Sequence, residues 1–278
     1  MSISLAIGDA PTDLQWLQTN YNNRARVPTA PEQLAEWASR SASTRARYAK
    51  RQRCTLDVAY GTSAGETLDV FVPKHSKQAA PRPVVVFIHG GYWRSLDKSD
   101  HSFLAPALDQ CAGDKGAVVV VPNYSLCPSV QVDDIALQMT RAMAWVFEYI
   151  HSFGGDASRV CVVGHSAGGH LAAMLLGCCW EQVHTSAGKP LPNNWLRRAV
   201  SISGLYDLAP LVPAPFLQDD LRLSPQTVQR CSPAYWPEPA KGKLFAVVGG
   251  DESDEFLRHN HMMRQVWGSK RVPHTSVL

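Results

Sequence analysis

The 278-residue sequence lacks the features that mark secreted or membrane-bound proteins. Its seven cysteines are odd in number and contain no C-x-x-C pair, so we expect free thiols and no disulfide framework. No apolar run approaches the length of a membrane span, and no basic segment followed by an apolar one opens the chain as a signal peptide would. These absences predict a cytoplasmic protein without a membrane partner.

Motifs for common metal and cofactor sites are also missing. The ten histidines include no H-E-x-x-H, and His259-x-His261 alone is a weak ligand pair. Neither G-x-x-x-x-G-K-[ST] nor a G-x-G-x-x-G turn after a strand occurs. The net charge is only +3, from 27 basic and 24 acidic residues, which does not favour nucleic acid. We therefore expect a small-molecule substrate and no metal, cofactor or nucleic acid, with a homodimer left open.

Short Val-rich runs alternate with helix-like stretches over most of the chain. Continuous apolar runs of this kind are typical of strands that are buried on both faces. Their alternation with helices predicts an α/β fold with a mostly parallel sheet between helices. The expected strands are 84–88, 117–121, 160–164, 199–202 and 244–249, and the expected helices are 101–112, 133–152, 167–180 and 254–267.

Two segments depart from this alternation. Residues 11–50 are predicted to be helical, with interruptions at Pro28 and Pro31. They lead into an antiparallel hairpin, CTLDVAY at 54–60 and TLDVFV at 67–72. We expect residues 1–53 to form a helical segment that packs on one α/β domain, 54–278. A Pro-rich excursion at 205–240 would either cover the active site or form a plain surface loop.

The strongest functional signal is Gly164-His165-Ser166-Ala167-Gly168, which follows a buried strand and opens a helix. In a G-x-S-x-G turn the serine takes a strained backbone conformation, and small residues two positions away avoid clashes. The hydroxyl then stands exposed at the carboxyl edge of the sheet. We therefore predict that Ser166 is a nucleophile and that the Ala167 amide binds a developing oxyanion.

A second turn, His89-Gly90-Gly91-Tyr92-Trp93, follows the first predicted parallel strand. Its glycines let the backbone approach a substrate and present N–H groups, as the second half of an oxyanion hole does. His89 is expected to anchor this turn. Trp93 fits equally well in a pocket wall or in the core.

The acid and the base should follow the serine in that order along the chain. Asp251 and Glu252, just after the strand at 244–249, are both candidates for the acid. Of the later histidines, His259 and His261 lie in a predicted helix, which leaves His274 as the base. Only GSKRVP separates Trp267 from His274, so the final strand and closing helix are expected to be missing.

Together these residues resemble the arylformamidase (kynurenine formamidase) branch of the hormone-sensitive-lipase-like α/β-hydrolases. The resemblance extends from about residue 15 to 267. It is carried by H-G-G-x-W at 89–93, N-Y at 123–124, L-C-P at 126–128, S-G-L-Y-D-L at 203–208, L-R-L-S at 221–224 and Y-N-N-R at 21–24.

The resemblance implies a triad of Ser166, Glu252 and His274, with Asp251 as the alternative acid. It also implies an oxyanion hole formed by the amides of Gly90, Gly91 and Ala167. The implied reaction is hydrolysis of N-formyl-L-kynurenine, a step of tryptophan catabolism. Trp93 and Tyr206 are expected to contact the substrate. The alternatives are a general short-chain carboxylesterase and a catalytically impaired homologue with a shortened C-terminus.

Overall fold

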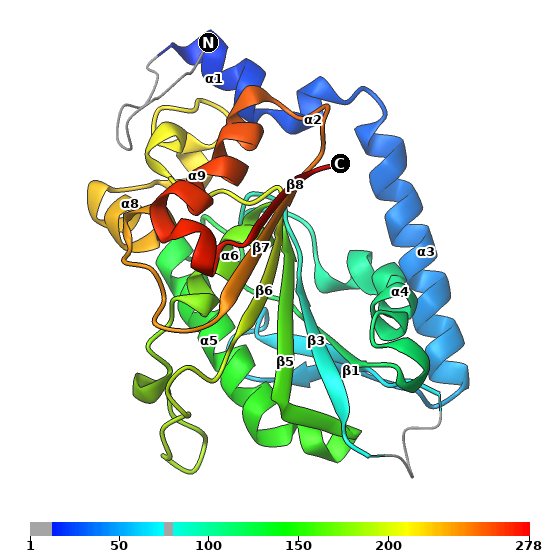
Figure 1. Cartoon of the computed structure of the whole chain (residues 1–278). Helices are drawn as coiled ribbons and strands as arrows, with labels where there is room; N and C mark the ends of the chain where they lie inside the picture. The colour runs from blue at the N-terminus through cyan, green and yellow to red at the C-terminus, as the bar shows by residue number, and fades with distance from the viewer. Residues whose placement is uncertain (1–12, 75–79) are drawn as a thin grey trace.

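An eight-stranded sheet forms the centre of the protein, in the order β1-β2-β4-β3-β5-β6-β7-β8 (Figure 1). The computed structural model describes residues 13–74 and 80–278, so the first twelve residues of the predicted helical segment lie outside the described part. The strands are β1 (Cys54–Ala59), β2 (Thr67–Phe71), β3 (Arg82–Ile88), β4 (Val118–Pro122), β5 (Gly155–His165), β6 (Arg198–Ile202), β7 (Lys243–Val248) and β8 (His274–Val277).

The pairing of the strands confirms the predicted sheet. β1 and β2 form an antiparallel hairpin, and β2 pairs antiparallel with β4. The pairs β4/β3, β3/β5, β5/β6, β6/β7 and β7/β8 are all parallel. Side chains of β4 alternate between two cores, with Val118 and Val120 on one face and Val119 and Val121 on the other. A strand with both faces buried needs apolar residues at every position, which explains the continuous Val runs.

Helices cover both faces of the sheet. Figure 1 shows α3 and α4 on one side and α5, α6, α8 and α9 on the other. The helices are α1 (Leu14–Tyr21), α2 (Asn23–Arg26), α3 (Ala30–Lys50), α4 (Ala105–Gln110), α5 (Val132–Tyr149), α6 (Ala167–Leu176), α7 (Gln218–Leu221), α8 (Pro225–Cys231) and α9 (Asp254–Arg271). Shorter 3-10 turns are η2 (Lys98–Leu104), η3 (Gly113–Lys115), η4 (Ile150–Phe153), η5 (Trp180–Gln182), η6 (Ala209–Leu211) and η7 (Pro233–Tyr235).

The C-terminal region corrects one expectation. The final strand, expected to be missing, is present as β8, and His274 is its first residue. Helix α9 ends in a kink at Gly268, where φ is +71°, and the chain then turns directly into β8. A glycine with positive φ reverses the chain in very few residues, so the short GSKRVP segment suffices.

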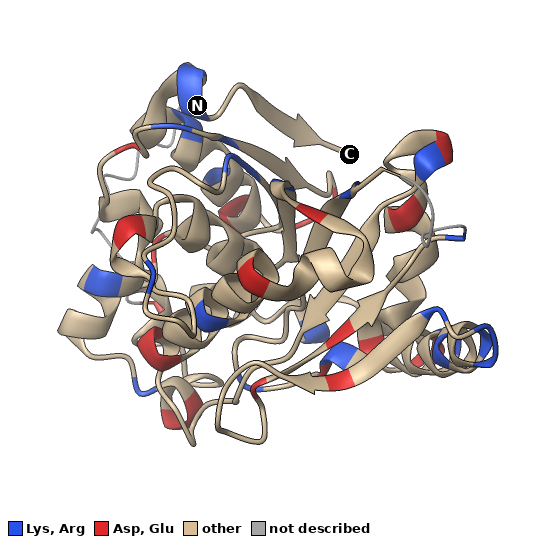
Figure 2. Ribbon diagram, turned by 90° about the horizontal axis from the view of Figure 1, so that it is seen from below, with Lys and Arg blue, Asp and Glu red and all other residues tan. Residues whose placement is uncertain are grey.

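The N-terminal helices pack against the α/β core at two places. α1 lies on α9, where the Tyr21 hydroxyl donates to Glu255 Oε2 at 2.5 Å. α3 runs along η2, and Phe103 N–H donates to Ser41 Oγ at 3.1 Å. Figure 2, in which α3 is seen nearly end-on, marks the Lys and Arg positions along this helix in blue.

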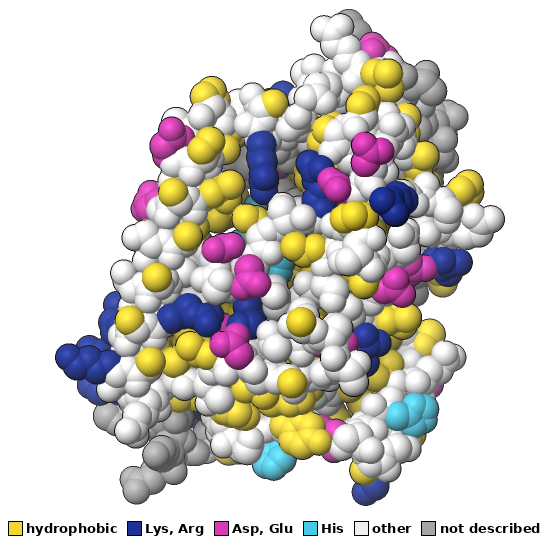
Figure 3. Space-filling model, turned by 180° about the vertical axis from the view of Figure 1, so that it is seen from behind, with side chains coloured by type: hydrophobic (Ala, Val, Ile, Leu, Met, Phe, Trp, Pro, Cys, Tyr) yellow, Lys and Arg dark blue, Asp and Glu magenta, His cyan; other side chains and the backbone are white. Residues whose placement is uncertain are grey.

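The charged side chains on the face seen in Figure 3 are mixed in sign, with acidic and basic groups interspersed. Within the described residues, no helix combines the length and the apolar content needed to cross a membrane.

Candidate active site

Ser166 stands at the tip of the bend between β5 and α6. Its backbone has φ of 56° and ψ of −118°, a conformation that L-residues rarely adopt. A Cβ on Gly164 would lie 2.0 Å from the carbonyl oxygen of Gly168, and one on Gly168 would lie 2.0 Å from that of Ile88. Gly164 is therefore required by the sharpness of the bend, and Gly168 by the close packing of the bend on the end of β3, at the two positions that the sequence spacing predicts.

The glycine turn after β3 packs directly against the bend. A Cβ on Gly90 would lie 3.0 Å from Ser166 Cβ, so the Gly90 backbone meets the serine at van der Waals distance. Gly91 has φ of +107°, which a side chain would strain. Within residues 13–74 and 80–278, the N–H groups of Gly90, Gly91 and Ala167 have no hydrogen-bond partner. The structure thus places the Gly90 backbone against Ser166, with Gly91 lining the same pocket and Ala167 next to the serine in the chain.

His89 lies beneath this turn and is fully buried. Its Nδ1 is 2.8 Å from the carbonyl oxygen of Gly90, and its Nε2 is 3.1 Å from Asn123 Oδ1. The ring stacks on Tyr124, with ring centres 4.3 Å apart. Burial and the nearby His101 ring lower the pKa of His89 to about 4, so the imidazole is neutral at pH 7. These contacts are those of an anchor for the turn.

Of the two acid candidates, Glu252 is the one held in place. Its Oε1 accepts hydrogen bonds from Ser203 Oγ at 2.5 Å and from Gly249 N–H at 2.8 Å. Ser203 directly follows β6, and its own N–H extends the sheet by donating to Val247 O at 2.7 Å. Asp251 is exposed. The fold therefore orients the carboxylate of Glu252 and leaves that of Asp251 in solvent.

The placement of His274 contradicts its predicted role as the base. Register pairs His165 with Ile202, Ile202 with Val247 and Val247 with Ser276, so His274 lies two levels below the end of β5. Three strand spacings add about 14 Å across the sheet, whereas a base must come within about 3 Å of the serine hydroxyl. His274 is also exposed and lies outside the pocket. Its position at the start of β8, and not after its end, separates it from Ser166.

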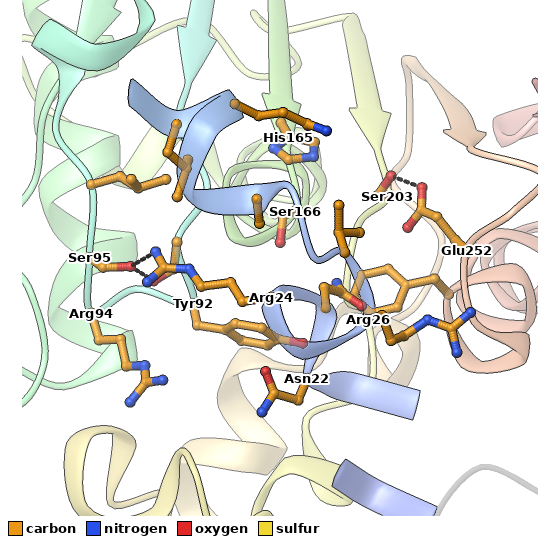
Figure 4. Close-up of a pocket in the computed structure, with 18 of the residues that line it drawn as sticks. Asn22, Arg24, Arg26, Tyr92, Arg94, Ser95, His165, Ser166, Ser203 and Glu252 are labelled. Carbon is orange, nitrogen blue, oxygen red and sulfur yellow. Dashed lines mark hydrogen bonds between the residues drawn. The ribbon is translucent and has the colours of Figure 1, made fainter. Parts of the chain in front are cut away.

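Among the described histidines, His165 is the one that lines the pocket of Ser166. Burial, with a smaller effect from His101, lowers the pKa of His165 to about 4. Figure 4 shows the Ser166 hydroxyl pointing into the pocket, away from the His165 ring. His165 therefore does not take the position of a base for Ser166.

The pocket around Ser166 has a volume of about 450 Å³, and segments far apart in the sequence line it (Figure 4). A pocket of this size fits a small organic molecule. Its lining residues include Asn22, Arg24, Arg26 and Trp37 from the N-terminal helices, Gly91, Tyr92, Arg94 and Ser95 after β3, Phe216 from the excursion, and Asp251, Glu252 and Phe256 after β7.

The two predicted substrate-contacting aromatics, Trp93 and Tyr206, do not reach this pocket. Both are fully buried. Trp93 packs edge-on against His170, with ring centres 4.9 Å apart, and the Tyr206 hydroxyl donates to Ser201 Oγ at 2.8 Å. Both predictions are wrong, because these side chains turn into the core beneath the carboxyl edge of the sheet.

Several residues of the pocket walls are not among those predicted from the sequence. Tyr92 lies in the glycine turn, and its hydroxyl donates to the Tyr21 carbonyl at 2.6 Å. Arg24 belongs to the Y-N-N-R motif at 21–24, which supports the resemblance but does not by itself indicate a function for the arginine. Ser203 opens another such motif, and its position directly after a core strand was the available signal.

Comparison with known proteins identifies the family. A match to the BD-FAE family covers residues 68–210, just over half of the chain. The chain belongs to the BD-FAE family. That region of this BD-FAE chain holds the glycine turn and the serine bend, but not α1–α3 or Glu252.

Relatives place this BD-FAE chain in the arylformamidase-like branch of the α/β-hydrolases. It is 35% identical to kynurenine formamidase of Danio rerio over 74% of this chain and 66% of the relative. Kynurenine formamidase of Salmo salar is 33% identical over 74% and 65%. The chain thus spans just under two thirds of the length of these relatives.

A solved structure from Silicibacter sp. tm1040, described as a candidate thioesterase, is similar with a TM-score of 0.75 and 28% identity. The similarity covers 92% of this BD-FAE chain and 88% of that one. The α/β-hydrolase fold predicted from the sequence is confirmed.

Proposed function

We propose that this chain is a serine hydrolase that cleaves an aryl formamide, N-formyl-L-kynurenine, into L-kynurenine and formate. The observation that carries the proposal is the contact between the Gly90 backbone and Ser166, together with the unpartnered N–H groups of Gly90, Gly91 and Ala167 in the described part of the chain. The similarity to proteins named kynurenine formamidase supports the choice of substrate.

In this reaction Ser166 Oγ attacks the formyl carbon. The N–H groups of Gly90, Gly91 and Ala167 bind the oxygen as it gains negative charge, which is where such donors lower the barrier most. The C–N bond then breaks, and the aryl amine leaves with the proton that the Ser166 hydroxyl lost in the attack. A formyl ester remains on Ser166, and water hydrolyses it to formate and restores the serine.

Proton transfer requires an imidazole between Ser166 and Glu252. The Glu252 Oε1 atom is occupied by Ser203 and Gly249, whereas Oε2 has no hydrogen-bond partner among the described residues. A carboxylate oxygen in this position orients an imidazole and stabilises its protonated form. None of the histidines in the described part of the chain stands there, so we assign the acid but no base.

The direct test is production of L-kynurenine from N-formyl-L-kynurenine by this chain and by its Ser166→Ala variant. Kynurenine is quantified by chromatography against an enzyme-free control. We expect turnover that depends on Ser166 and is unaffected by Ser152→Ala, which removes an exposed hydroxyl. Equal rates with and without the Ser166 hydroxyl would refute the proposal.

A short-chain carboxylesterase is the second candidate. The pocket volume of about 450 Å³ accepts a larger acyl group than formyl, and the chemistry at Ser166 would be the same. Parallel assays with p-nitrophenyl acetate separate the two candidates. Good ester turnover with negligible formamide turnover selects the esterase.

The third candidate, an impaired homologue with a binding role, is favoured by the remote position of His274. Labelling with a fluorophosphonate tests it, because the reagent reports an activated serine. A folded protein whose Ser166 stays unlabelled would support a binding role.

A further inference from the structure

The N-terminal segment forms one wall of the pocket and is fixed there by several hydrogen bonds. Tyr92 donates to the carbonyl of Tyr21, and Ser253 Oγ donates to that of Asn20 at 2.6 Å. The Tyr21 hydroxyl donates to Glu255 Oε2, at the start of α9. Because both sides of Tyr21 are anchored, α2 is held across the mouth of the pocket, with Arg24 and Arg26 facing the cavity (Figure 4).

Three arginines line this pocket, and they differ in what balances their charge. Arg94 forms an ion pair with Asp220. Arg26 Nη2 lies 3.5 Å from the backbone carbonyl of Asp251, on the same side as Glu252. Arg24 Nη2 donates to a neutral group, Ser95 Oγ, at 3.0 Å. Within residues 13–74 and 80–278, no carboxylate forms an ion pair with Arg24 or Arg26.

The position of Ser95 explains why Arg24 stays directed into the cavity. Ser95 Oγ accepts from Arg24 and donates to the carbonyl of Gly91 at 3.0 Å, which ties the guanidinium to the turn beside Ser166. A guanidinium presents several N–H groups in a planar fork that matches a carboxylate. Since Ser95 uses only part of that fork, further N–H groups remain for a ligand.

We propose that Arg24, supported by Arg26, binds the carboxylate of a substrate whose scissile bond lies at Ser166. The substrate class is an aryl formamide or aryl ester that carries a carboxylate on its leaving group. This inference rests on the proposed function in that it assumes hydrolysis at Ser166. The aromatic side chains of Tyr92 and Phe216, whose ring centres are 6.1 Å apart, line the same cavity and would contact the aryl ring.

Two substrates that differ only at the carboxylate test this assignment. They are N-formyl-L-kynurenine and its carboxamide, which keeps the ring, the formyl group and the ammonium. For Arg24→Gln we expect kcat/KM on the carboxylate to fall about tenfold, mainly through KM, because a charge-assisted hydrogen bond is lost. The carboxamide should change less than about twofold. Arg24→Lys should recover part of the loss because it restores the charge without the fork.

The control variant is Arg51→Gln, which removes an exposed charge at the far end of α3. It should behave like the parent chain on both substrates. An equal loss on carboxylate and carboxamide in Arg24→Gln, or no loss on either, overturns the inference.

Binding of the product separates this inference from the proposed function. Calorimetry with L-kynurenine and L-kynurenine carboxamide requires no catalysis. We expect the parent chain to bind the acid more tightly, and Arg24→Gln to weaken only that binding, by about tenfold. If no formamide is cleaved but this pattern holds, the proposed function fails and the carboxylate site stands. If the parent chain does not discriminate between the two compounds, the carboxylate site fails even where formamides are cleaved.

Discussion

The carboxyl edge of the sheet has two corners that are built very differently. The nucleophile corner comprises Gly90, Gly91 and the bend Gly164–Gly168; the acid corner comprises the turn Gly249–Glu252 with the end of β8. In the first, a Cβ on either bend glycine would meet a backbone carbonyl at 2.0 Å. In the second, a Cβ on Gly249 or Gly250 would meet its nearest atom at 3.2 Å.

The nucleophile corner is therefore determined by steric contacts, whereas the acid corner is determined by the register of the strands. Close backbone contacts determine the nucleophile corner, both within the bend and between the bend and the end of β3, so few residues other than glycine satisfy it and its motif is recognisable. The acid corner depends on where distant strands end relative to one another. A shift of three residues along β8 decides whether His274 stands at the edge or beneath it.

The largest expected difference in stability is between the variants Gly168→Ala and Gly249→Ala. The first places a methyl group against the Ile88 carbonyl and should lower the free energy of unfolding by about 3 kcal/mol or more. The second meets only the end of the Glu252 side chain and should cost less than about 1 kcal/mol. Urea denaturation measures both. Similar midpoints for the two variants would show that the corners are equally tolerant.

The buried histidines behind the nucleophile corner should make the stability of the protein depend on pH. Burial lowers the pKa of His170, behind the nucleophile corner, to about 4, as it does for His89 and His165. The unfolded chain protonates histidine near pH 6.5. Unfolding therefore takes up protons below that pH, and stability should fall as pH drops from about 6.5 to 4, by up to about 1.4 kcal/mol per pH unit for each group.

His170→Gln should reduce this slope, whereas His184→Gln, which replaces an exposed histidine, should not. Urea titrations at several pH values between 4 and 8 measure it. An unchanged slope in His170→Gln would mean that the ring is protonated in the folded protein.

At the acid corner, Glu252→Ala and Asp251→Ala form a matched pair. Loss of the Glu252 carboxylate leaves Ser203 and Gly249 without their acceptor and should cost about 1 kcal/mol. Asp251 makes no side-chain hydrogen bond among the described residues, so its removal should cost less than about 0.5 kcal/mol. Thermal or urea unfolding compares them, and a larger cost for Asp251 would reverse the assignment of the acid.

The smallest effect is expected for His274→Ala. Its distance from Ser166 predicts that hydrolysis and fluorophosphonate labelling change by less than about twofold. Added imidazole, which can occupy the space beside Glu252 Oε2, should raise the rate of the parent chain and of His274→Ala equally. If His274→Ala lost activity and added imidazole restored it, His274 would be the base.

The sequence was sufficient for the fold and for the nucleophile corner, because each strand and each of the two turns carries a short recognisable motif. Val-rich runs require buried strands, and the spacing of Gly164, Ser166 and Gly168 requires a sharp bend. The predicted role of His274 as the base was wrong, because nothing in GSKRVP shows that Gly268 reverses the chain and lets β8 begin at His274. The predictions for Trp93 and Tyr206 were also wrong, because the direction of a side chain there depends on loop geometry that no periodicity reports.

The wall formed by α2 and the start of α3 comes from a stretch of chain that precedes the whole sheet. Under the proposed function, the reacting serine belongs to the strand ends, whereas the arginines proposed to bind the carboxylate come from residues 20–37. Exchanging that short stretch between relatives would transplant these arginines and leave the bend, Tyr92 and Phe216 where they are. Recognition of a charged group on the ligand can then change at the front of the chain without disturbing the strained bend.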